Sequence, residues 1–190
     1  MRIVAGAWRG RNLAAPPGQA TRPTADRVRQ ALFDMLLHAP WGGRAVLEGA
    51  VVLDAFAGTG AMGLEALSRG AATCVFFECD PAALRALRAN IAACKAEGRS
   101  RVIAADVFTS GSGEAATLAF LDPPYGQDLV PRAVAHLGRL GWLAPGALIV
   151  AETGRDEDWL PDGGLLAERA HGAARIIVYR LPGTDSTAAA

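Results

Sequence analysis

The stretch LDAFAGTGAMGLEA, residues 53–66, decides the fold that we expect for this chain. An apolar strand run ends at Asp54, the pattern G-x-G-x-x-G occupies Gly58, Gly60 and Gly63, and an apolar helical pattern follows. A strand, a glycine-rich turn and a helix in this order open the first βαβ unit of many nucleotide-binding α/β proteins. The glycines alone do not separate a dinucleotide from another adenosyl ligand, so the surrounding residues have to decide.

The chain after residue 50 predicts more units of the same kind. Short apolar runs alternate with longer helical patterns, which is typical of a mostly parallel sheet flanked by helices. We expect strands at residues 51–55, 73–78, 101–105, 117–121, 147–152 and 175–181. We expect helices at about 61–69, 81–95 and 129–140, with Asp80 and Pro81 at the start of the second. A loop rich in Gly, Asp and Pro is expected before the last strand.

The first residues of the chain predict a small extension of another kind. The Ile3-Val4 pair and the Trp8 segment, punctuated by glycines, suit a β-hairpin, and residues 14–18 suit a stiff linker. The residues after about 182 predict a frayed tail. We therefore divide the chain into an extension at residues 1–44, an α/β domain at 45–182 and a flexible tail at 183–190.

Charge is distributed unevenly, although the chain carries no formal net charge. Residues 1–50 hold seven arginines against three acidic residues, a net charge of +4, and the remainder carries −4. Thr24 is expected to cap a helix on which Arg27 and Arg29 lie off the apolar stripe and face outward. Because arginine makes forked phosphate contacts and stacks on bases, the extension is predicted to face a nucleic acid.

Composition argues against several other classes of protein. With 190 residues and 51% hydrophobic side chains, the chain suits one α/β domain with a sizeable core. No apolar run approaches the roughly 20 residues that cross a bilayer, and the amino terminus lacks the apolar centre of a signal peptide. Cys74, Cys79 and Cys94 lack the paired spacing of a zinc site, which predicts reduced thiols and no metal. We expect a cytoplasmic monomer without a membrane partner.

Asp54 points to a ligand other than a dinucleotide. A dinucleotide places its pyrophosphate against the helix amino terminus, where backbone N–H groups favour negative charge. A carboxylate at the end of the preceding strand would repel that phosphate. Asp54 stands there, four residues before Gly58, and suits a ligand with a cationic amino group and no phosphates. S-adenosylmethionine is such a ligand.

Two further acids are expected at the ends of the next strands. Glu78 ends the second strand, where a carboxylate accepts hydrogen bonds from ribose hydroxyls in either class of cofactor. Asp106 follows the third strand, where an acid could meet the amino group of an adenine. Both support an adenosyl ligand, and neither decides which one.

The sequence Asp122-Pro123-Pro124-Tyr125 directly follows the fourth expected strand. Two prolines remove two N–H groups and fix two φ angles, which leaves a rigid turn with unpaired carbonyl acceptors. The carboxylate beside such a carbonyl makes a two-acceptor clamp that matches the two donors of a planar NH₂ group. Tyr125 offers a ring on which a base can stack, an interaction worth roughly 1 to 3 kcal/mol.

Taken together, these motifs resemble the class I S-adenosylmethionine-dependent methyltransferases that modify exocyclic amino groups of nucleic-acid bases. The segments RIVAGAWRGRNL, RPTADRVRQALFDML and FAGTGAMGLEALSRGA resemble the RsmD family in particular, over about residues 2–179. The resemblance implies a Rossmann-like, mostly parallel seven-stranded sheet. It also implies methylation of the N2 amine of a guanine in 16S rRNA, presented in a small ribosomal subunit or its assembly intermediate.

The resemblance also assigns residues. The cofactor S-adenosyl-L-methionine would be bound by Asp54, Phe56, Ala57, Gly58, Thr59, Gly60, Glu78 and Asp106. The target amine would be held by Asp122, Pro123, Pro124 and Tyr125. The basic extension would contact RNA through Arg9, Arg11, Arg22, Thr24, Arg27 and Arg29. We expect Asp122 to act as a clamp first, because a carboxylate of ordinary acidity is a weak base.

Two alternatives remain open from the sequence. DPPY is shared with DNA adenine-N6 methyltransferases, although those usually carry a separate target-recognition region for which this chain has little room. A non-catalytic RNA-binding or ribosome-assembly module could also keep this fold. The presence of both Asp54 and DPPY disfavours the second alternative.

Overall fold

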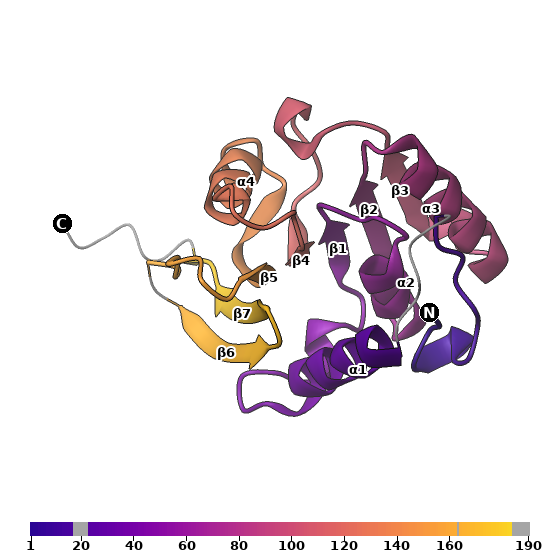
Figure 1. Ribbon diagram of the computed structural model, residues 1–190, viewed down its shortest axis with the longest axis horizontal. Helices are drawn as coiled ribbons and strands as arrows, with labels where there is room; N and C mark the ends of the chain where they lie inside the picture. The colour runs from indigo at the N-terminus through magenta and orange to yellow at the C-terminus, as the bar shows by residue number, and fades with distance from the viewer. Residues whose placement is uncertain (17–22, 163, 184–190) are drawn as a thin grey trace.

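The computed structural model describes residues 1–16, 23–162 and 164–183, which are organised around one mixed sheet (Figure 1). In the described part of the chain the seven strands follow the order β3-β2-β1-β4-β5-β7-β6. Pairing is parallel from β3 through β5, whereas β7 is antiparallel to both β5 and β6. The strands are β1 Val51–Asp54, β2 Thr73–Phe77, β3 Ser100–Ile103, β4 Ala116–Leu121, β5 Leu143–Gly154, β6 Leu165–His171 and β7 Ala174–Arg180. The mostly parallel seven-stranded α/β fold is thus confirmed.

The helices of the described residues follow the sequence pattern closely. The α-helices are α1 Pro23–His38, α2 Ala61–Ser68, α3 Pro81–Cys94 and α4 Leu129–Arg139. The 3₁₀ turns are η1 Gly6–Trp8, η2 Arg44–Val46, η3 Glu97–Arg99 and η4 Val107–Thr109. Asp80 caps α3 as expected, because its side chain accepts hydrogen bonds from the N–H groups of Ala82 and Ala83. No α-helix among those described is long and apolar enough to cross a bilayer.

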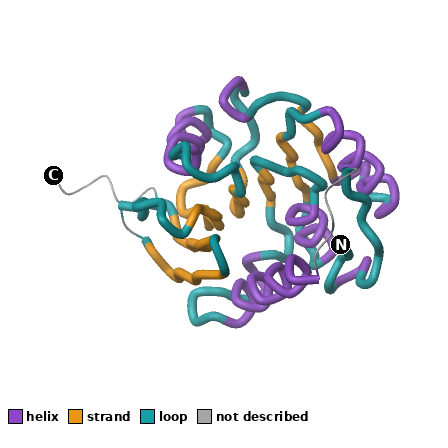
Figure 2. The backbone as a smooth tube through the Cα atoms, viewed as in Figure 1, coloured by secondary structure: helices purple, strands orange, loops and turns teal. Residues whose placement is uncertain are grey.

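Each face of the sheet is covered by its own hydrophobic cluster. One cluster joins alternate strand residues such as Val52 and Leu118 to the apolar sides of α1, α2 and α3. The other joins Leu53 and Ile149 to α4 and to the buried Trp142. Figure 2 shows α4 on one side of the strands and the other α-helices on the opposite side. Alternation of side chains along each strand therefore produces a three-layer arrangement.

The expected N-terminal β-hairpin is present only in a minimal form. Arg2 and Asn12 form a single isolated antiparallel bridge, and the residues around Trp8 form the 3₁₀ turn η1. Gly6 and Gly10 have φ values of +80° and +83°, which interrupt the extended backbone that two paired strands need. Backbone hydrogen bonds from Ile3 N to Arg11 O, Gly10 N to Ile3 O and Leu13 N to Met1 O join the two arms. Ile3 and Leu13 are buried in the same cluster as β1.

A buried carboxylate in α2 anchors this loop. Glu65 is fully buried and accepts backbone hydrogen bonds from Val4 N at 2.7 Å and Ala5 N at 3.0 Å. Its carboxylate also pairs with Arg69 at 2.7 Å and with Arg29 at 3.6 Å. Glu65 therefore ties the N-terminal segment to the helix that follows the glycine loop.

The expectation that Arg29 faces outward is wrong, because its guanidinium pairs with the buried Glu65. Its side chain is only 4% exposed, and Nη2 donates to the Asp26 carboxylate at 2.8 Å and to the Arg2 carbonyl. A buried guanidinium needs such partners, and Glu65 on another helix is one of them. The pattern of apolar residues in α1 could not indicate that Arg29 has a partner on another helix. Arg27 is exposed, as expected.

Other details of the sequence reading need correction or fall outside the described residues. Thr24 lies inside α1, which begins at Pro23, and therefore does not precede the helix as its cap. Strand β6 replaces part of the expected Gly/Asp/Pro loop, and its mostly exposed residues at the sheet edge give no apolar run to detect. Arg22, part of the predicted linker and most of the predicted tail lie outside the described residues.

The third glycine of the quoted stretch has a packing function. A Cβ on Gly63 would lie 2.4 Å from Phe76 Cε1 and 2.5 Å from Cys74 Sγ, so α2 lies against β2 only without a side chain there. We expect Gly63→Ala to lower the free energy of unfolding by about 1 to 3 kcal/mol in urea denaturation. Gly138→Ala in α4 is the matched control, because a Cβ there meets open space. We expect this substitution to raise the free energy of unfolding by at most about 1 kcal/mol. Equal effects of the two substitutions would contradict this account.

Candidate active site

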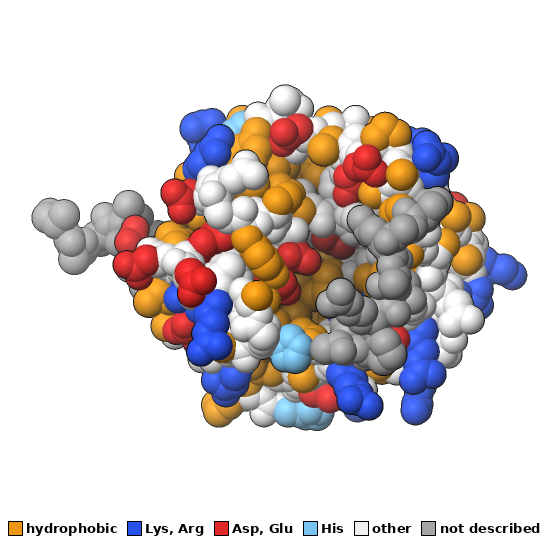
Figure 3. All heavy atoms as spheres, viewed as in Figure 1, with side chains coloured by type: hydrophobic (Ala, Val, Ile, Leu, Met, Phe, Trp, Pro, Cys, Tyr) orange, Lys and Arg blue, Asp and Glu red, His pale blue; other side chains and the backbone are white. Residues whose placement is uncertain are grey.

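A large cavity opens where the parallel strands end. It has a volume of about 1340 Å³ and lies beside the carboxyl ends of β1, β2, β4 and β5. The strand order reverses at β1, with β2 on one side and β4 on the other, which is where ligands bind in open α/β sheets. Figure 3 shows this hollow on one face of the molecule, with acidic side chains inside it and around its rim.

Most of the predicted cofactor and amine residues meet in this one cavity. Those that line it are Asp54, Phe56, Ala57, Gly58, Thr59, Glu78, Asp106, Asp122, Pro123, Pro124 and Tyr125. Gly60 does not line it. Gly60 is the N-cap of α2, and Leu87 Cδ1 would lie 2.4 Å from a Cβ at that position. The ends of four strands thus bring together residues that lie far apart in the sequence.

Asp54 is the most deeply placed of these acids. Only 4% of the residue is exposed, and Oδ2 accepts a hydrogen bond from Gly63 N at 3.0 Å. Burial raises the pKa of Asp54 to about 7, opposed by the Gly63 N–H and assisted by the nearby charge of Glu78. Its carboxyl therefore gains a proton at near-neutral pH unless a cation lies beside it.

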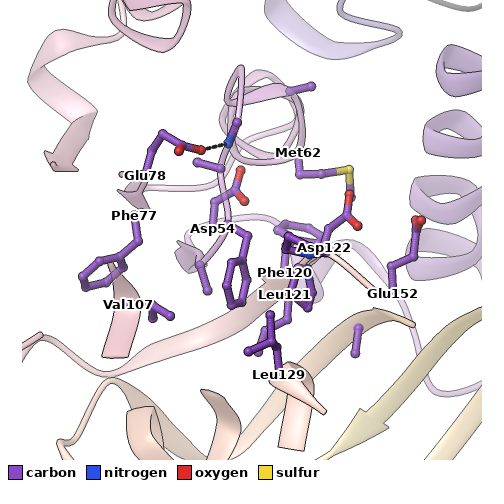
Figure 4. A pocket seen from close by; sticks show the side chains of 18 of the residues that line it. Asp54, Met62, Phe77, Glu78, Val107, Phe120, Leu121, Asp122, Leu129 and Glu152 are labelled. Atoms are coloured by element: carbon purple, nitrogen blue, oxygen red, sulfur yellow. Dashed lines mark hydrogen bonds between the residues drawn. The ribbon is translucent and has the colours of Figure 1, made fainter. Parts of the chain in front are cut away.

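Glu78 fastens the glycine loop to the end of β2. Its Oε2 accepts from Gly58 N at 2.7 Å, the contact drawn as a dashed line in Figure 4. Its Oε1 accepts from Cys79 N at 2.8 Å and from Asp80 N at 2.7 Å. Gly58 has a φ of +54°, and a Cβ there would meet open space. The residue type at position 58 is thus set by backbone conformation rather than by packing.

Asn90 is a contact of the loop that the sequence reading missed. Its buried side chain donates to the Thr59 carbonyl at 2.9 Å and exchanges two hydrogen bonds with the backbone of Ala14. It therefore joins α3, the glycine loop and the N-terminal segment. No motif surrounds Asn90 in the sequence, so only the tertiary structure reveals it.

Asp106 is exposed at the cavity edge and caps η4 by accepting from Phe108 N at 2.9 Å.

The DPPY turn faces the same cavity from the end of β4. Pro123 is buried, whereas the Tyr125 side chain is 45% exposed. The Tyr125 hydroxyl donates to the carboxylate of Glu152 at the end of β5. Asp122 is open to the cavity, yet the surrounding protein, the charge of Glu152 and the charge of Asp54 raise its pKa to about 7. Figure 4 shows Asp54, Asp122 and Glu152 around one space.

Glu152 is the second residue that sequence reasoning missed. It ends the expected fifth strand, where it reads as an ordinary polar terminus. Strand pairing places Ala151 opposite Leu121, so Asp122, directly after β4, lies beside Glu152, which is still within β5. A register between strands cannot be read from one sequence, although an acid at the end of a buried strand next to DPPY is a usable signal.

The predicted RNA contacts divide into three groups. Arg9, Arg11 and Arg27 are exposed, and the Arg11 guanidinium donates to the Ala93 carbonyl. Arg29 is buried and lines the cavity from α1. Thr24 lies in the first turn of α1, and Arg22 lies outside the described residues. Among the described residues there is no group of three or more His, Cys, Asp and Glu side chains that could hold a metal ion.

Comparison with known proteins adds independent evidence. The family described as Conserved hypothetical protein 95 matches residues 1–180. Ribosomal RNA small subunit methyltransferase D of Escherichia coli K12 is 43% identical over 155 residues, which cover 80% of this chain and 74% of that protein. The protein of the same name from Haemophilus influenzae is 35% identical and covers 95% of this chain and 92% of its own length.

Solved structures agree with these relatives. The Escherichia coli protein YhhF superposes with a TM-score of 0.82 at 36% identity, over 97% of this chain and 99% of that one. An RNA methyltransferase from Salinibacter ruber, solved with S-adenosyl-L-homocysteine, has the same fold, with a TM-score of 0.58 at 21% identity over 86% and 94% of the two chains. The fold and the relatives thus define a class I methyltransferase. This chain belongs to the RsmD family.

The raised pKa of Asp54 predicts a pH-dependent stability. Because the folded pKa lies above the ordinary value, the neutral carboxyl stabilises the fold below about pH 4, and this contribution is lost as pH rises through about 7. Asp54→Asn mimics the neutral form. We expect the free energy of unfolding of the variant, relative to that of the wild type, to rise by roughly 2 to 4 kcal/mol between pH 4 and pH 8. Chemical denaturation measures this difference.

Asp156→Asn is the control for this titration, because it replaces an exposed carboxyl away from the cavity. Its difference from the wild type should stay constant over the same range of pH. A constant difference for Asp54→Asn as well would contradict the burial argument.

Proposed function

We propose that this chain transfers a methyl group from S-adenosyl-L-methionine to the exocyclic N2 amine of a guanine in 16S rRNA. The observation that carries the proposal is the meeting of two motifs in one cavity. The glycine loop with Asp54 and Glu78 forms one wall, and the DPPY turn forms the other. The proposed setting is the cytoplasm, with the small ribosomal subunit or its assembly intermediate as the partner.

The residues present fit an adenosyl ligand with a cationic amino group. Asp54 is a buried carboxylate that needs a cation to remain ionised at neutral pH. Gly58 leaves open space beside the cavity, and Glu78 and Asp106 line it from the ends of β2 and β3. Asp54 would hold the amino group, Glu78 the ribose and Asp106 the adenine. The bound cofactor would supply an activated methyl group on a sulfonium.

The DPPY turn would hold the amine that accepts the methyl group. Asp122 and the Pro123 carbonyl would accept the two N–H donors of the planar NH₂ group. These acceptors would favour a pyramidal nitrogen and stabilise the positive charge that develops on it, which is a preorganised electrostatic effect. The half-exposed ring of Tyr125 would stack on the base.

The RNA substrate is supported by the relatives and by the charge distribution. Two relatives above 30% identity are named small-subunit ribosomal RNA methyltransferases. Arg9, Arg11 and Arg27 offer exposed positive charge for phosphates, while the cavity itself is rich in carboxylates. A base reaches such a recessed site only after leaving its stack, which is easiest for a loop nucleotide.

The role of Asp122 is tested by separating binding from transfer. Asp122→Ala removes one acceptor of the amine clamp but no residue assigned to the cofactor. We expect methyl transfer to rRNA to fall at least about 100-fold. Binding of S-adenosylmethionine, measured by calorimetry, should be nearly unchanged. Asp156→Ala serves as a control with wild-type transfer, and undiminished transfer by Asp122→Ala would refute the assignment.

A further inference from the structure

Two carboxylates lie side by side where β4 ends and β5 nears its end. The strands are parallel, and Leu121 pairs with Ala151, so the next residues, Asp122 and Glu152, are lateral neighbours. Adjacent strands lie about 4.8 Å apart, and residues in register point to the same face. Both side chains line the cavity, as Figure 4 shows. Two like charges in this position repel each other unless a proton or a cation lies between them.

Glu152 also holds the last residue of the DPPY turn. Its half-buried carboxylate accepts the hydrogen bond of the Tyr125 hydroxyl. The following residue is fixed separately, since Gly126 N donates to Glu157 Oε1 at 2.7 Å. Tyr125 is thereby held at its hydroxyl and the next residue at its backbone, while 45% of Tyr125 stays exposed.

The charged groups around Asp122 are predominantly acidic. Glu152 on β5 and Asp54 on β1 face it most directly, and Tyr125 lies on its own turn. The other residues with titratable groups that line the cavity are Met1, with the amino terminus, Arg29, Glu78, Cys79, Asp80, Asp106, Arg132 and His171. Arg29 is already engaged by Asp26 and Glu65. Within the described residues, neither Asp122 nor Glu152 forms an ion pair with a basic side chain.

We propose that Glu152 is a positioning residue that holds the Tyr125 ring for the target base and makes Asp122 the proton acceptor of the reaction. This inference rests on the proposed function and deepens it. As the bond between the guanine nitrogen and the methyl carbon forms, the bond between that carbon and sulfur breaks. The amine then carries one proton too many, and this proton passes to an Asp122 oxygen and later to water.

The electrostatics of the pair support this role. Desolvation, the charge of Glu152 and the charge of Asp54 raise the pKa of Asp122 to about 7. A carboxylate of ordinary acidity is a poor base at neutral pH, whereas one that titrates near 7 is matched to the task. Burial and the hydrogen bond to Glu152 likewise raise the pKa of the Tyr125 phenol, so it stays protonated and continues to donate.

Glu152→Gln tests the charge, because glutamine keeps an oxygen that accepts from Tyr125. In the wild type, kcat/KM for methyl transfer should rise with pH through about 7 as Asp122 ionises. In the variant we expect this acidic limb to move down by about one pH unit. Glu157→Gln, which changes the neighbouring carboxylate that holds Gly126, should leave the limb in place. An unmoved limb in Glu152→Gln would overturn the inference.

Tyr125→Phe tests the hydrogen bond separately. It keeps the ring and the Glu152 carboxylate but removes the donor, so we expect a higher KM for RNA with the acidic limb unmoved. A KM equal to that of the wild type would overturn the positioning of the ring.

A readout without catalysis keeps this inference distinct from the proposed function. The Asp122 carboxyl can be titrated by carbon NMR in the ligand-free wild type and in Glu152→Gln. A lower pKa in the variant supports the pairing even if no RNA is methylated, in which case only the proposed function fails. Equal titration in both proteins overturns the inference whatever the activity.

Discussion

One hydrogen bond, from the Gly63 N–H to the buried Asp54 carboxylate, holds the two ends of the glycine loop together. It joins the end of β1 to α2 across the glycine loop, and it forms because Gly63 lets the helix lie against Phe76 and Cys74. The loop between them is then held by Glu78 at Gly58. Gly63, the third glycine of the dinucleotide-like pattern, thus serves the packing of α2 against β2. Its N–H also orients Asp54, the acid that argues against a dinucleotide ligand.

Parallel register then determines the character of the cavity. Because β1, β4 and β5 are neighbours, Asp54, Asp122 and Glu152 end at one edge of the sheet. Desolvation and the nearby acidic charges disfavour ionisation of Asp54 and Asp122, so the site gains from a cationic ligand and from a transferable proton. A sulfonium methyl donor with an ammonium group and an amine that loses a proton satisfy both conditions. The same electrostatics therefore support the proposed cofactor and the proposed step.

The sequence predicted the elements with strong local signals, namely the glycine loop, the Asp80 cap and the buried strands. It failed where the signal depends on tertiary structure. Arg29 is buried because Glu65 of another helix pairs with it, and β6 is an exposed edge strand without an apolar run. The sequence did not indicate Glu152, because its role depends on a strand register. It did not indicate Asn90, because that residue contacts a loop distant in the sequence. The assignments of individual site residues stay predictions.

The identity of the methylated nucleoside tests the central claim most directly. Small ribosomal subunits, naked 16S rRNA and duplex DNA would each be incubated with the protein and isotopically labelled S-adenosylmethionine, then digested to nucleosides for mass spectrometry. This account predicts labelled N2-methylguanosine from the RNA samples and no labelled base from DNA. Labelled N6-methyladenine, or no label in any sample under conditions where the cofactor binds, would contradict it.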